Sequence, residues 1–240
     1  DALWKQNDLN LRLNPYGCVC LGDMIGMIEV VLNSDTIANI THERGGATAA
    51  FSVDPLTVWL RKNCRTEAEF EACVRNFVRS CAGYCVATYV LGIGDRHNDN
   101  IMLSRKGDLF HIDFGHFLGN FKSFKGIYKR ETTPFVFTPM YAHVMGGTDG
   151  ESYKQFVKMG CDAFLVLRKN GHMLMNLFLL MLSSGIPELT SIQDIAWLRK
   201  VLKLHVSEEE AIRHFEKQIK KSLKNTRARI NDAVHIYAKK

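Results

Sequence analysis

The chain has 240 residues, 46% hydrophobic and 23% charged, with 18 glycines, 5 prolines and a net charge of +6. This composition excludes disordered, collagen-like and low-complexity proteins, and the length suffices for one large domain or two lobes. Seven cysteines without a secretory signal indicate free thiols, and the longest weakly polar run, residues 80–94, is shorter than the roughly 20 residues of a membrane span. We therefore expect a soluble intracellular protein.

The first fifty-odd residues predict one clear strand and a short helix. Residues 27–32 form a mostly apolar run bounded by glycine before it and by Asn-Ser-Asp after it, which is typical of a strand. Asp54 and Pro55 have the residue types favoured at the cap and the first position of a helix, which we expect to run through Trp59.

A long helix and a hairpin follow. Thr66 and Glu69 have the spacing of a capping box. The apolar residues after it recur at intervals of three and four and predict one buried helical stripe, made of Phe70, Val74, Phe77, Val78, Cys81 and Cys85. Glycines at 92 and 94 end the helix, and residues 101–104 and 108–112 predict two strands joined by a turn at 106–107.

The second half of the chain is predicted to be helical. Residues 115–134 have no long periodic pattern, and from Tyr153 onward the sequence indicates helices with breaks near 169–171, 183–187 and 204–207. The sequence has no internal repeat and no long linker. We expect an α+β protein in which a small strand-bearing front part rests on a large helical back part.

The positive charge is concentrated at the end of the chain. Residues 211–240 contain nine basic and two acidic residues. Cations surround an apolar helical stripe made of Ile212, Phe215, Ile219 and Leu223. Such a helix suits an anionic membrane or packing against the rest of the protein. Nucleic acid is a weaker alternative, because aromatic residues are sparse here.

Two loops flank the predicted hairpin and carry the strongest chemical signal. They read DRHNDN at residues 95–100 and HIDFG at residues 111–115. Protein kinases combine a D-x-x-x-x-N spacing, kept here by Asp95 and Asn100, with a later D-F-G, kept here by Asp113. Because the hairpin folds the chain back, both loops can open on one cleft. Asn100 and Asp113 are then predicted ligands of Mg²⁺, which prefers hard oxygen atoms.

The order Asp-Arg-His in the first loop departs from protein kinases and resembles phosphoinositide 3-kinases, of class I or class II, in the PI3/PI4-kinase superfamily. The likeness covers essentially the whole chain and is strongest in residues 94–102 and 110–118, with further similarity in residues 15–18, 27–31, 80–91 and 185–189. It implies a protein-kinase-like fold with a mainly helical C-lobe and a small part of the N-lobe sheet. Residues 1–35 would end the N-lobe and form the hinge, and residues 36–240 would form the C-lobe, with the catalytic loop at 94–102, the activation loop at 113–134 and the C-terminal helices at 153–240.

The resemblance also implies an activity and its residues. A lipid kinase of this family transfers the γ-phosphate of ATP to the 3-hydroxyl of the inositol ring of phosphatidylinositol or its phosphates, with Mg²⁺. The catalytic set would be Asp95, His97, Asn100, Asp113 and His116, with His97 as the proton acceptor. ATP would contact Tyr16, Ile28, Glu29, Val30, Val31, Met102, Phe110, Ile112 and Asp113.

The resemblance assigns the lipid head group to the basic activation loop, with Lys122, Lys125, Lys129 and Arg130 as its receptor. The pair at 129–130 matches the family, whereas the threonines at 132–133 depart from its pattern. That departure puts recognition of phosphatidylinositol 4,5-bisphosphate in doubt and leaves unphosphorylated and 4-phosphorylated inositides open.

Two parts of a kinase are not found in the sequence. It contains neither a G-x-G-x-x-G loop nor the lysine strand that contacts the phosphates. We expect these parts upstream of Asp1, so that the chain is a fragment or a truncated gene model and is inactive alone. The resemblance implies phosphoinositides at a membrane surface as partners, and it favours the membrane as the place of the basic C-terminal helix. Further expected partners are the remaining N-lobe and accessory domains and a possible regulatory subunit, without nucleic acid. We expect a cytoplasmic protein that is recruited peripherally to membranes.

Alternative functions remain open. They are a phosphoinositide 4-kinase, an atypical Ser/Thr kinase with an Asp-Arg-His loop, and a non-catalytic remnant that binds a membrane or a partner. Zinc binding finds no support in the cysteine spacing, as in Cys18-x-Cys20.

Overall fold

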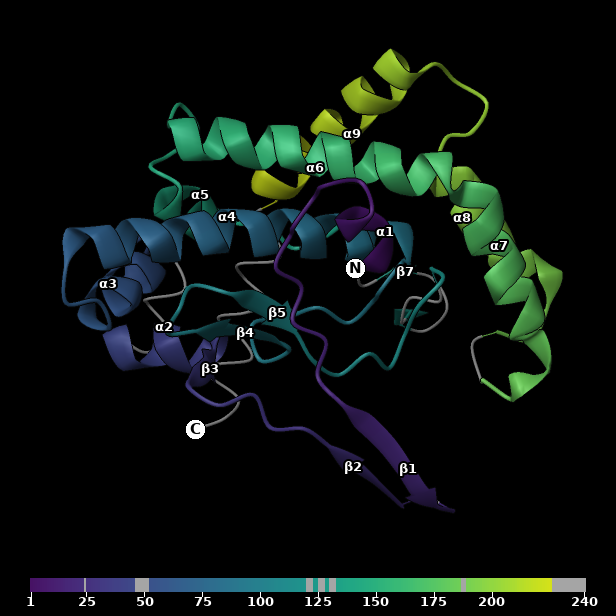
Figure 1. The fold of residues 1–240 in the computed structure, drawn as a ribbon, viewed down its shortest axis with the longest axis horizontal. Coiled ribbons are helices and arrows are strands. Elements are labelled where there is room, and N and C mark those ends of the chain that lie inside the picture. The colour runs from purple at the N-terminus through teal and green to yellow at the C-terminus, as the bar shows by residue number, and fades with distance from the viewer. Residues whose placement is uncertain are drawn as a thin grey trace.

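The computed structural model describes residues 1–23, 25–45, 52–119, 123–124, 128–129, 133–186 and 189–225. Helices dominate, and three small antiparallel sheets accompany them (Figure 1). In chain order the elements are α1 (Ala2–Lys5), β1 (Cys18–Gly22), β2 (Ile25–Ile28), β3 (Ser34–Thr36), α2 (Ile37–Gly45), α3 (Pro55–Lys62), α4 (Glu67–Val90), β4 (Ile101–Ser104), β5 (Leu109–His111), β6 (Ser123–Phe124), β7 (Tyr128–Lys129), α5 (Pro139–Val144), α6 (Glu151–Lys169), α7 (Gly171–Leu180), η2 (Leu182–Ser184), α8 (Ile192–Val201) and α9 (Glu208–Leu223). The expected α+β class with a helical majority is confirmed.

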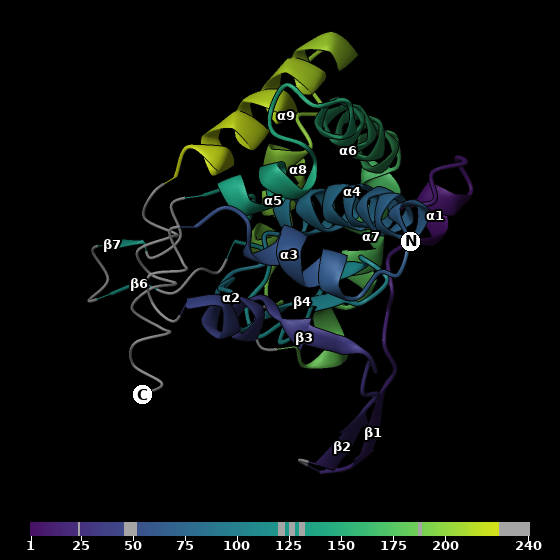
Figure 2. The same ribbon diagram turned by 90° about the vertical axis from the view of Figure 1, so that its left-hand side faces the viewer.

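Helix α4 runs through the middle of the molecule, between α6 on one side and the sheet β3-β4-β5 on the other (Figures 1 and 2). The Thr66 hydroxyl caps it by accepting a hydrogen bond from the Glu69 backbone N–H at 3.2 Å. The Glu69 carboxylate accepts from the backbone N–H of Arg65 at 2.6 Å, so the second half of the predicted capping box is displaced by one residue. The C-terminal half of α4 is almost wholly buried, which makes it the centre of the core.

The predicted hairpin at residues 101–112 is confirmed as β4 and β5, with Met102 opposite Phe110. Strand β3 pairs with the other edge of β4, and Asp35 lies opposite Leu103. Alternate residues of β4 are buried, as expected of a strand with one face on the core. The hairpin is therefore fixed on one side by α4 and on the other by β3.

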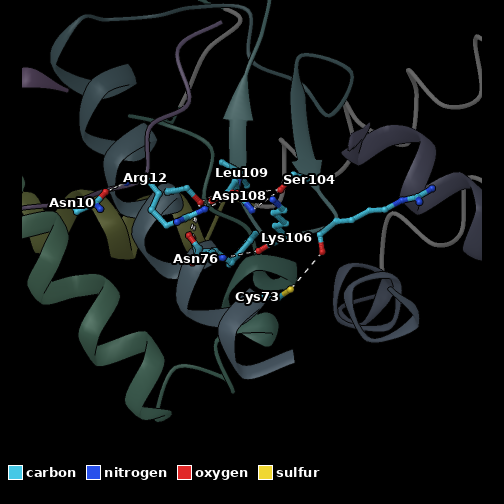
Figure 3. A network of polar contacts seen from close by, with 11 residues as sticks. Asn10, Arg12, Cys73, Asn76, Ser104, Lys106, Asp108 and Leu109 are labelled. Atoms are coloured by element: carbon cyan, nitrogen blue, oxygen red, sulfur yellow. Dashed lines mark hydrogen bonds and ion pairs between the residues drawn. The ribbon is translucent and has the colours of Figure 1, made fainter. Parts of the chain in front are cut away.

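Polar contacts fasten the hairpin turn to its surroundings (Figure 3). The Arg12 guanidinium donates to both carboxylate oxygens of Asp108, at 2.6 and 3.1 Å. The Asn76 side chain on α4 donates to the backbone carbonyl of Lys106 at 2.8 Å. The Ser80 hydroxyl accepts from the Leu109 backbone N–H at 2.9 Å. These bonds hold the turn against α4 and against the segment after α1.

The strand predicted at residues 27–32 has different bounds in the structure. Strand β2 ends at Ile28, and the backbone N–H of Glu29 makes one more bond to Gly17 at 2.8 Å. The chain then turns away, because Asn33 adopts a positive φ of 56° and the Ser34 hydroxyl donates to the Val31 carbonyl at 2.6 Å. The hairpin β1–β2 projects from the body and exposes its apolar side chains (Figures 1 and 2).

The helices of the back part begin and end near the predicted breaks. Asn170 caps α6, Gly185 ends η2 in a left-handed conformation, and capping boxes led by Ser191 and Ser207 begin α8 and α9. Among the described helices, none combines the length and the apolar character needed to cross a membrane.

The apolar stripe of α9 packs inside the protein, which corrects its expected place on a membrane. Phe215 and Ile219 are each 1% exposed, and the Phe215 ring stacks on Phe164 of α6 with centroids 5.0 Å apart. An amphipathic pattern requires an apolar partner without specifying which one, and here the partner is α6. Residues 226–240, with the rest of the basic end, lie outside the described residues.

Candidate active site

The two loops that carry the kinase-like motifs lie side by side. Strands β4 and β5 pair Ile101 with His111, so the loop before β4 and the loop after β5 emerge at the same end of the hairpin. The Ile112 backbone N–H donates to the Asn100 carbonyl at 3.0 Å, and the Gly94 N–H donates to the His116 carbonyl at 2.9 Å. The predicted proximity of the loops is thereby explained by backbone pairing.

Both motif carboxylates sit on left-handed backbone. Asp95 has a φ of 55° and Asp113 a φ of 58°. Non-glycine residues held in this region cost about 1–3 kcal/mol each and cluster at functional sites, although aspartate tolerates it better than most residues. In each loop the chain therefore turns at the residue that carries the carboxylate.

Arg96 links the loops and was missed by the sequence analysis. Its guanidinium donates to the Gly94 carbonyl at 2.9 Å, to the Ile112 carbonyl at 2.6 Å and to the Asp113 carbonyl. It also lies 5.5 Å from the centroid of the Phe114 ring. Burial lowers the pKa of Arg96, opposed by the charges of Asp113 and Asp95, and a guanidinium remains charged under all ordinary conditions. Arg96 is therefore a positioning residue for the D-F-G segment.

We expect Arg96→Ala to lower the free energy of unfolding by about 3 kcal/mol, because it leaves carbonyls of both loops without their charged donor. Arg96→Lys is the matched control: it keeps the charge but not the planar fork, and should recover part of the loss. Urea-induced unfolding measures both. The interpretation is wrong if both variants stay within about 0.5 kcal/mol of the wild-type protein.

Asn100 and Asp113 have the chemistry of a magnesium site. Asn100 is 7% exposed, and its amide nitrogen donates to the Asp95 carbonyl at 2.9 Å, which leaves the amide oxygen as the group for a ligand. The Asp113 side chain is exposed. Among the described residues, no group of three or more His, Cys, Asp or Glu is placed so that it could hold a metal ion. One carboxylate and one amide fit Mg²⁺, which keeps waters and phosphate oxygens as its other ligands.

The two predicted catalytic histidines lie in the same loops. The His97 imidazole Nδ1 is 3.7 Å from the Asp99 carboxylate, and both side chains are half-buried. This distance is longer than a hydrogen bond, so the Asp99 carboxylate is a charged neighbour of the imidazole. His116 is half-buried, and its backbone joins the pairing with Gly94.

Besides Asp113, the residues predicted to contact ATP fall into three groups according to their exposure. Tyr16, Val31, Met102 and Ile112 are half-buried, and Ile28, Glu29 and Val30 are exposed on the projecting hairpin and just after it. The Tyr16 phenol forms a hydrogen bond with the backbone of Asp113, so the ring lies beside the D-F-G segment. Burial raises the pKa of Tyr16. Phe110 is 0% exposed, so its ring belongs to the core instead of an open wall of the slot.

Most of the predicted head-group receptor lies outside the residues that the structure describes. Lys122, Lys125 and Arg130 lie outside the described residues. Lys129 lies in β7, opposite Ser123 of β6, but its side chain is outside the described part. The head-group site stays a prediction.

His111, between the two loops and α4, is a second residue that the sequence analysis missed. It is 3% exposed, and its ring stacks on Tyr84 with centroids 5.1 Å apart and an interplanar angle of 5°. Burial, and then the charge of Arg96, lowers the pKa of His111 to about 3. The imidazole is therefore neutral in the folded protein.

This neutral histidine predicts a loss of stability in acid. In the unfolded chain His111 takes up a proton near pH 6.5, whereas in the folded protein it does so only near pH 3. The free energy of unfolding should therefore fall as the pH decreases from about 6.5 towards 3, by up to about 1.4 kcal/mol per pH unit from this site. Urea titrations across this range test it with His111→Phe, which should flatten the slope. An unchanged slope in that variant would contradict the assignment.

Known proteins match the chain over nearly all of its length. Residues 1–191 match the family described as "Phosphatidylinositol 3- and 4-kinase". Among curated proteins of Dictyostelium discoideum, the chain is 51% identical to phosphatidylinositol 3-kinase 1 over 236 residues and 52% identical to phosphatidylinositol 3-kinase 2 over 238 residues. It is 50% identical to phosphatidylinositol 3-kinase 3 over 238 residues. These alignments cover 98–99% of this chain and 13–15% of the relatives.

Proposed function

Because the chain belongs to the phosphatidylinositol 3- and 4-kinase family, we propose that it forms the catalytic lobe of a phosphatidylinositol 3-kinase. The reaction transfers the γ-phosphate of ATP to the 3-hydroxyl of phosphatidylinositol or its phosphates. The observation that carries this proposal is the pairing of the Asp95–Asn100 loop with the Asp113 segment through the β4–β5 hairpin and Arg96. Relatives that are 50–52% identical and are named phosphatidylinositol 3-kinases support the choice of hydroxyl.

Each residue has a part in the proposed chemistry. His97, with the Asp99 carboxylate 3.7 Å from its Nδ1, accepts the proton of the attacking hydroxyl, and Asp95 helps to place that hydroxyl. Asn100 and Asp113 would hold Mg²⁺, which would supply positive charge to offset that of the phosphates. His116, in the segment after the D-F-G, would lie near the transferred phosphate. In-line positioning and charge stabilisation account for most phosphoryl-transfer catalysis, and a rigid pair of loops serves both.

The exposed hairpin β1–β2 supports the proposal that another part of the polypeptide packs on this surface. Its apolar side chains are more than half exposed, with Val19 at 54%, Leu21 at 57%, Ile25 at 63%, Met27 at 57% and Ile28 at 70%. The chain spans only 13–15% of its relatives. We assign this surface to the remainder of an N-lobe that brings the glycine-rich loop and the phosphate-binding lysine, so the 240 residues alone are inactive. The complete enzyme would be cytoplasmic and would act at a membrane surface.

A lipid-kinase assay on the natural polypeptide that contains this chain tests the proposal. Vesicles carry phosphatidylinositol, its 4-phosphate or its 4,5-bisphosphate, with Mg-ATP, and chromatography locates the new phosphate. A 3-phosphorylated product supports the proposal. A 4-phosphorylated product indicates a 4-kinase, phosphate on protein alone indicates a Ser/Thr kinase, and no product from folded protein indicates a non-catalytic remnant.

The same assay tests the proposed head-group site. Lys129→Ala combined with Arg130→Ala should change the ratio of activities between lipids by about tenfold, because each lost cation removes a charge-assisted bond to a phosphate. Turnover of ATP on the unphosphorylated lipid should change less. Lys154→Ala combined with Lys158→Ala on α6 removes the same charge elsewhere and should leave the ratio unchanged. An equal effect of the two double variants would argue against a head-group site at 129–130.

A further inference from the structure

Two cysteines at the joint between α3 and α4 have their sulfur atoms in contact. Cys64 follows the end of α3, and Cys73 lies in the second turn of α4. Their Sγ atoms are 3.5 Å apart, and both thiols are free. A disulfide has an S–S distance of about 2.05 Å, so the two sulfurs need to approach by about 1.5 Å. Cys64 lies outside regular structure, in the segment of residues 63–66 between the helices, where side-chain rotation and small backbone shifts are permitted.

The two thiols differ in their surroundings. Cys64 is half-buried and can be reached from solvent, whereas Cys73 is 7% exposed. The Cys73 thiol also contacts the backbone carbonyl of Arg105 at 3.5 Å. Burial, and then the neighbouring Cys64 sulfur, raises the pKa of Cys73 to about 12. Cys64 is therefore the thiol that meets an oxidant first, and Cys73 is the thiol that follows.

We propose that Cys64 and Cys73 form a reversible disulfide when the protein meets a peroxide, which makes the α3–α4 joint a redox modification site. In the first step the Cys64 thiolate attacks one oxygen of the peroxide, the O–O bond breaks and Cys64 becomes a sulfenic acid. In the second step the Cys73 sulfur attacks the Cys64 sulfur, and the hydroxyl leaves as water with the Cys73 proton. Two thiols are oxidised by two electrons in total, and hydrogen peroxide is reduced to two waters.

The other cysteines lack this combination of contact and access. Cys81 and Cys85 have Sγ atoms 3.9 Å apart, but both are buried and lie one turn apart in the same helix, α4. A bond between them would distort the helix, and an oxidant has no path to them. Cys18 and Cys20 are exposed but lie two residues apart in the single strand β1. Cys161 is buried in α6.

The modified joint borders the turn of the β4–β5 hairpin. Figure 3 shows Cys73 beside this turn, together with Asn76, which bonds the Lys106 carbonyl. Oxidation removes the S–H group of Cys73 and with it the contact to the Arg105 carbonyl. Asn76 retains its own bond, so the turn stays attached to α4 while one contact is lost.

The proposal is tested on the natural polypeptide in which the two exposed cysteines are replaced, Cys18→Ser and Cys20→Ser. This protein is treated with peroxide, and its peptides are then mapped. Trypsin cleaves after Arg65, between the two cysteines, so the disulfide joins two peptides that dithiothreitol separates. We expect this linked pair at a peroxide dose that leaves Cys81 and Cys85 as thiols. In Cys73→Ser, Cys64 should accumulate as a sulfenic acid that dimedone captures, and in Cys64→Ser, Cys73 should remain a thiol.

Peptide mapping of the protein that keeps both Cys64 and Cys73 tests the proposal even if the single variants do not fold. The proposal is overturned if Cys64 is oxidised to a sulfenic or sulfinic acid without a link to Cys73. It is also overturned if both remain thiols while the protein's other cysteines react, or if a Cys81–Cys85 link forms at the same dose.

Discussion

Replacing Asp113 by alanine should abolish phosphate transfer and leave the protein folded. The Asp113 side chain is exposed, and its position is set by backbone contacts from Arg96 and Tyr16, which do not depend on the carboxylate. Loss of the carboxylate removes the charged ligand proposed for Mg²⁺, and a loss of about a thousandfold or more in rate corresponds to about 4 kcal/mol of transition-state stabilisation. Initial rates with saturating Mg-ATP and lipid measure the loss.

Two control variants separate chemistry from folding. Asp113→Asn keeps the size and the tolerance of a φ of 58°, so its unfolding midpoint should match that of the wild-type protein while its activity is lost. Asp149→Ala removes an exposed carboxylate before α6 and should leave the rate unchanged. Full activity in Asp113→Asn would show that this carboxylate does not hold the metal.

Local signals in the sequence predicted the elements that carry the site. The D-x-x-x-x-N and D-F-G spacings, the two short apolar runs and the turn at 106–107 lie within twenty residues of one another, so neighbouring residues determine them. The helix cap at Thr66 and the hairpin of β4 and β5 are confirmed for the same reason. Roles assigned to single side chains, such as His97, stay predictions, because they concern a substrate.

Tertiary contacts account for what the sequence did not reveal. Arg96 is one of many charged residues until its carbonyl partners at 112 and 113 are known, and those partners depend on strand pairing. The stripe of Phe215 and Ile219 indicates an apolar partner but not whether it is a membrane or α6. Strand β2 ends at Ile28, opposite Cys18 at the start of β1, and the apolar run itself does not specify where its partner strand begins.

Gly107→Ala should be strongly destabilising. Gly107 is buried in the β4–β5 turn with a φ of +88°. A Cβ atom there would lie 2.1 Å from the carbonyl oxygen and 2.7 Å from the carbonyl carbon of Cys73. These are backbone atoms of α4, so no side-chain rotation can relieve the clash. The left-handed backbone adds about 1 kcal/mol and the overpacking about 1–3 kcal/mol, a large share of a typical stability of about 5–15 kcal/mol.

Gly147→Ala provides a matched control, because Gly147 has nearly the same φ, +86°, and no atom within 4 Å of its added Cβ. It should lose only the backbone contribution of about 1 kcal/mol, and the difference between the two variants isolates the contact with α4. Urea unfolding measures both. Equal losses would mean that the turn moves away from Cys73 at little cost. The hairpin would then be positioned by Arg12 and Ser80 instead of by close backbone packing, and both motif loops would depend on those polar contacts.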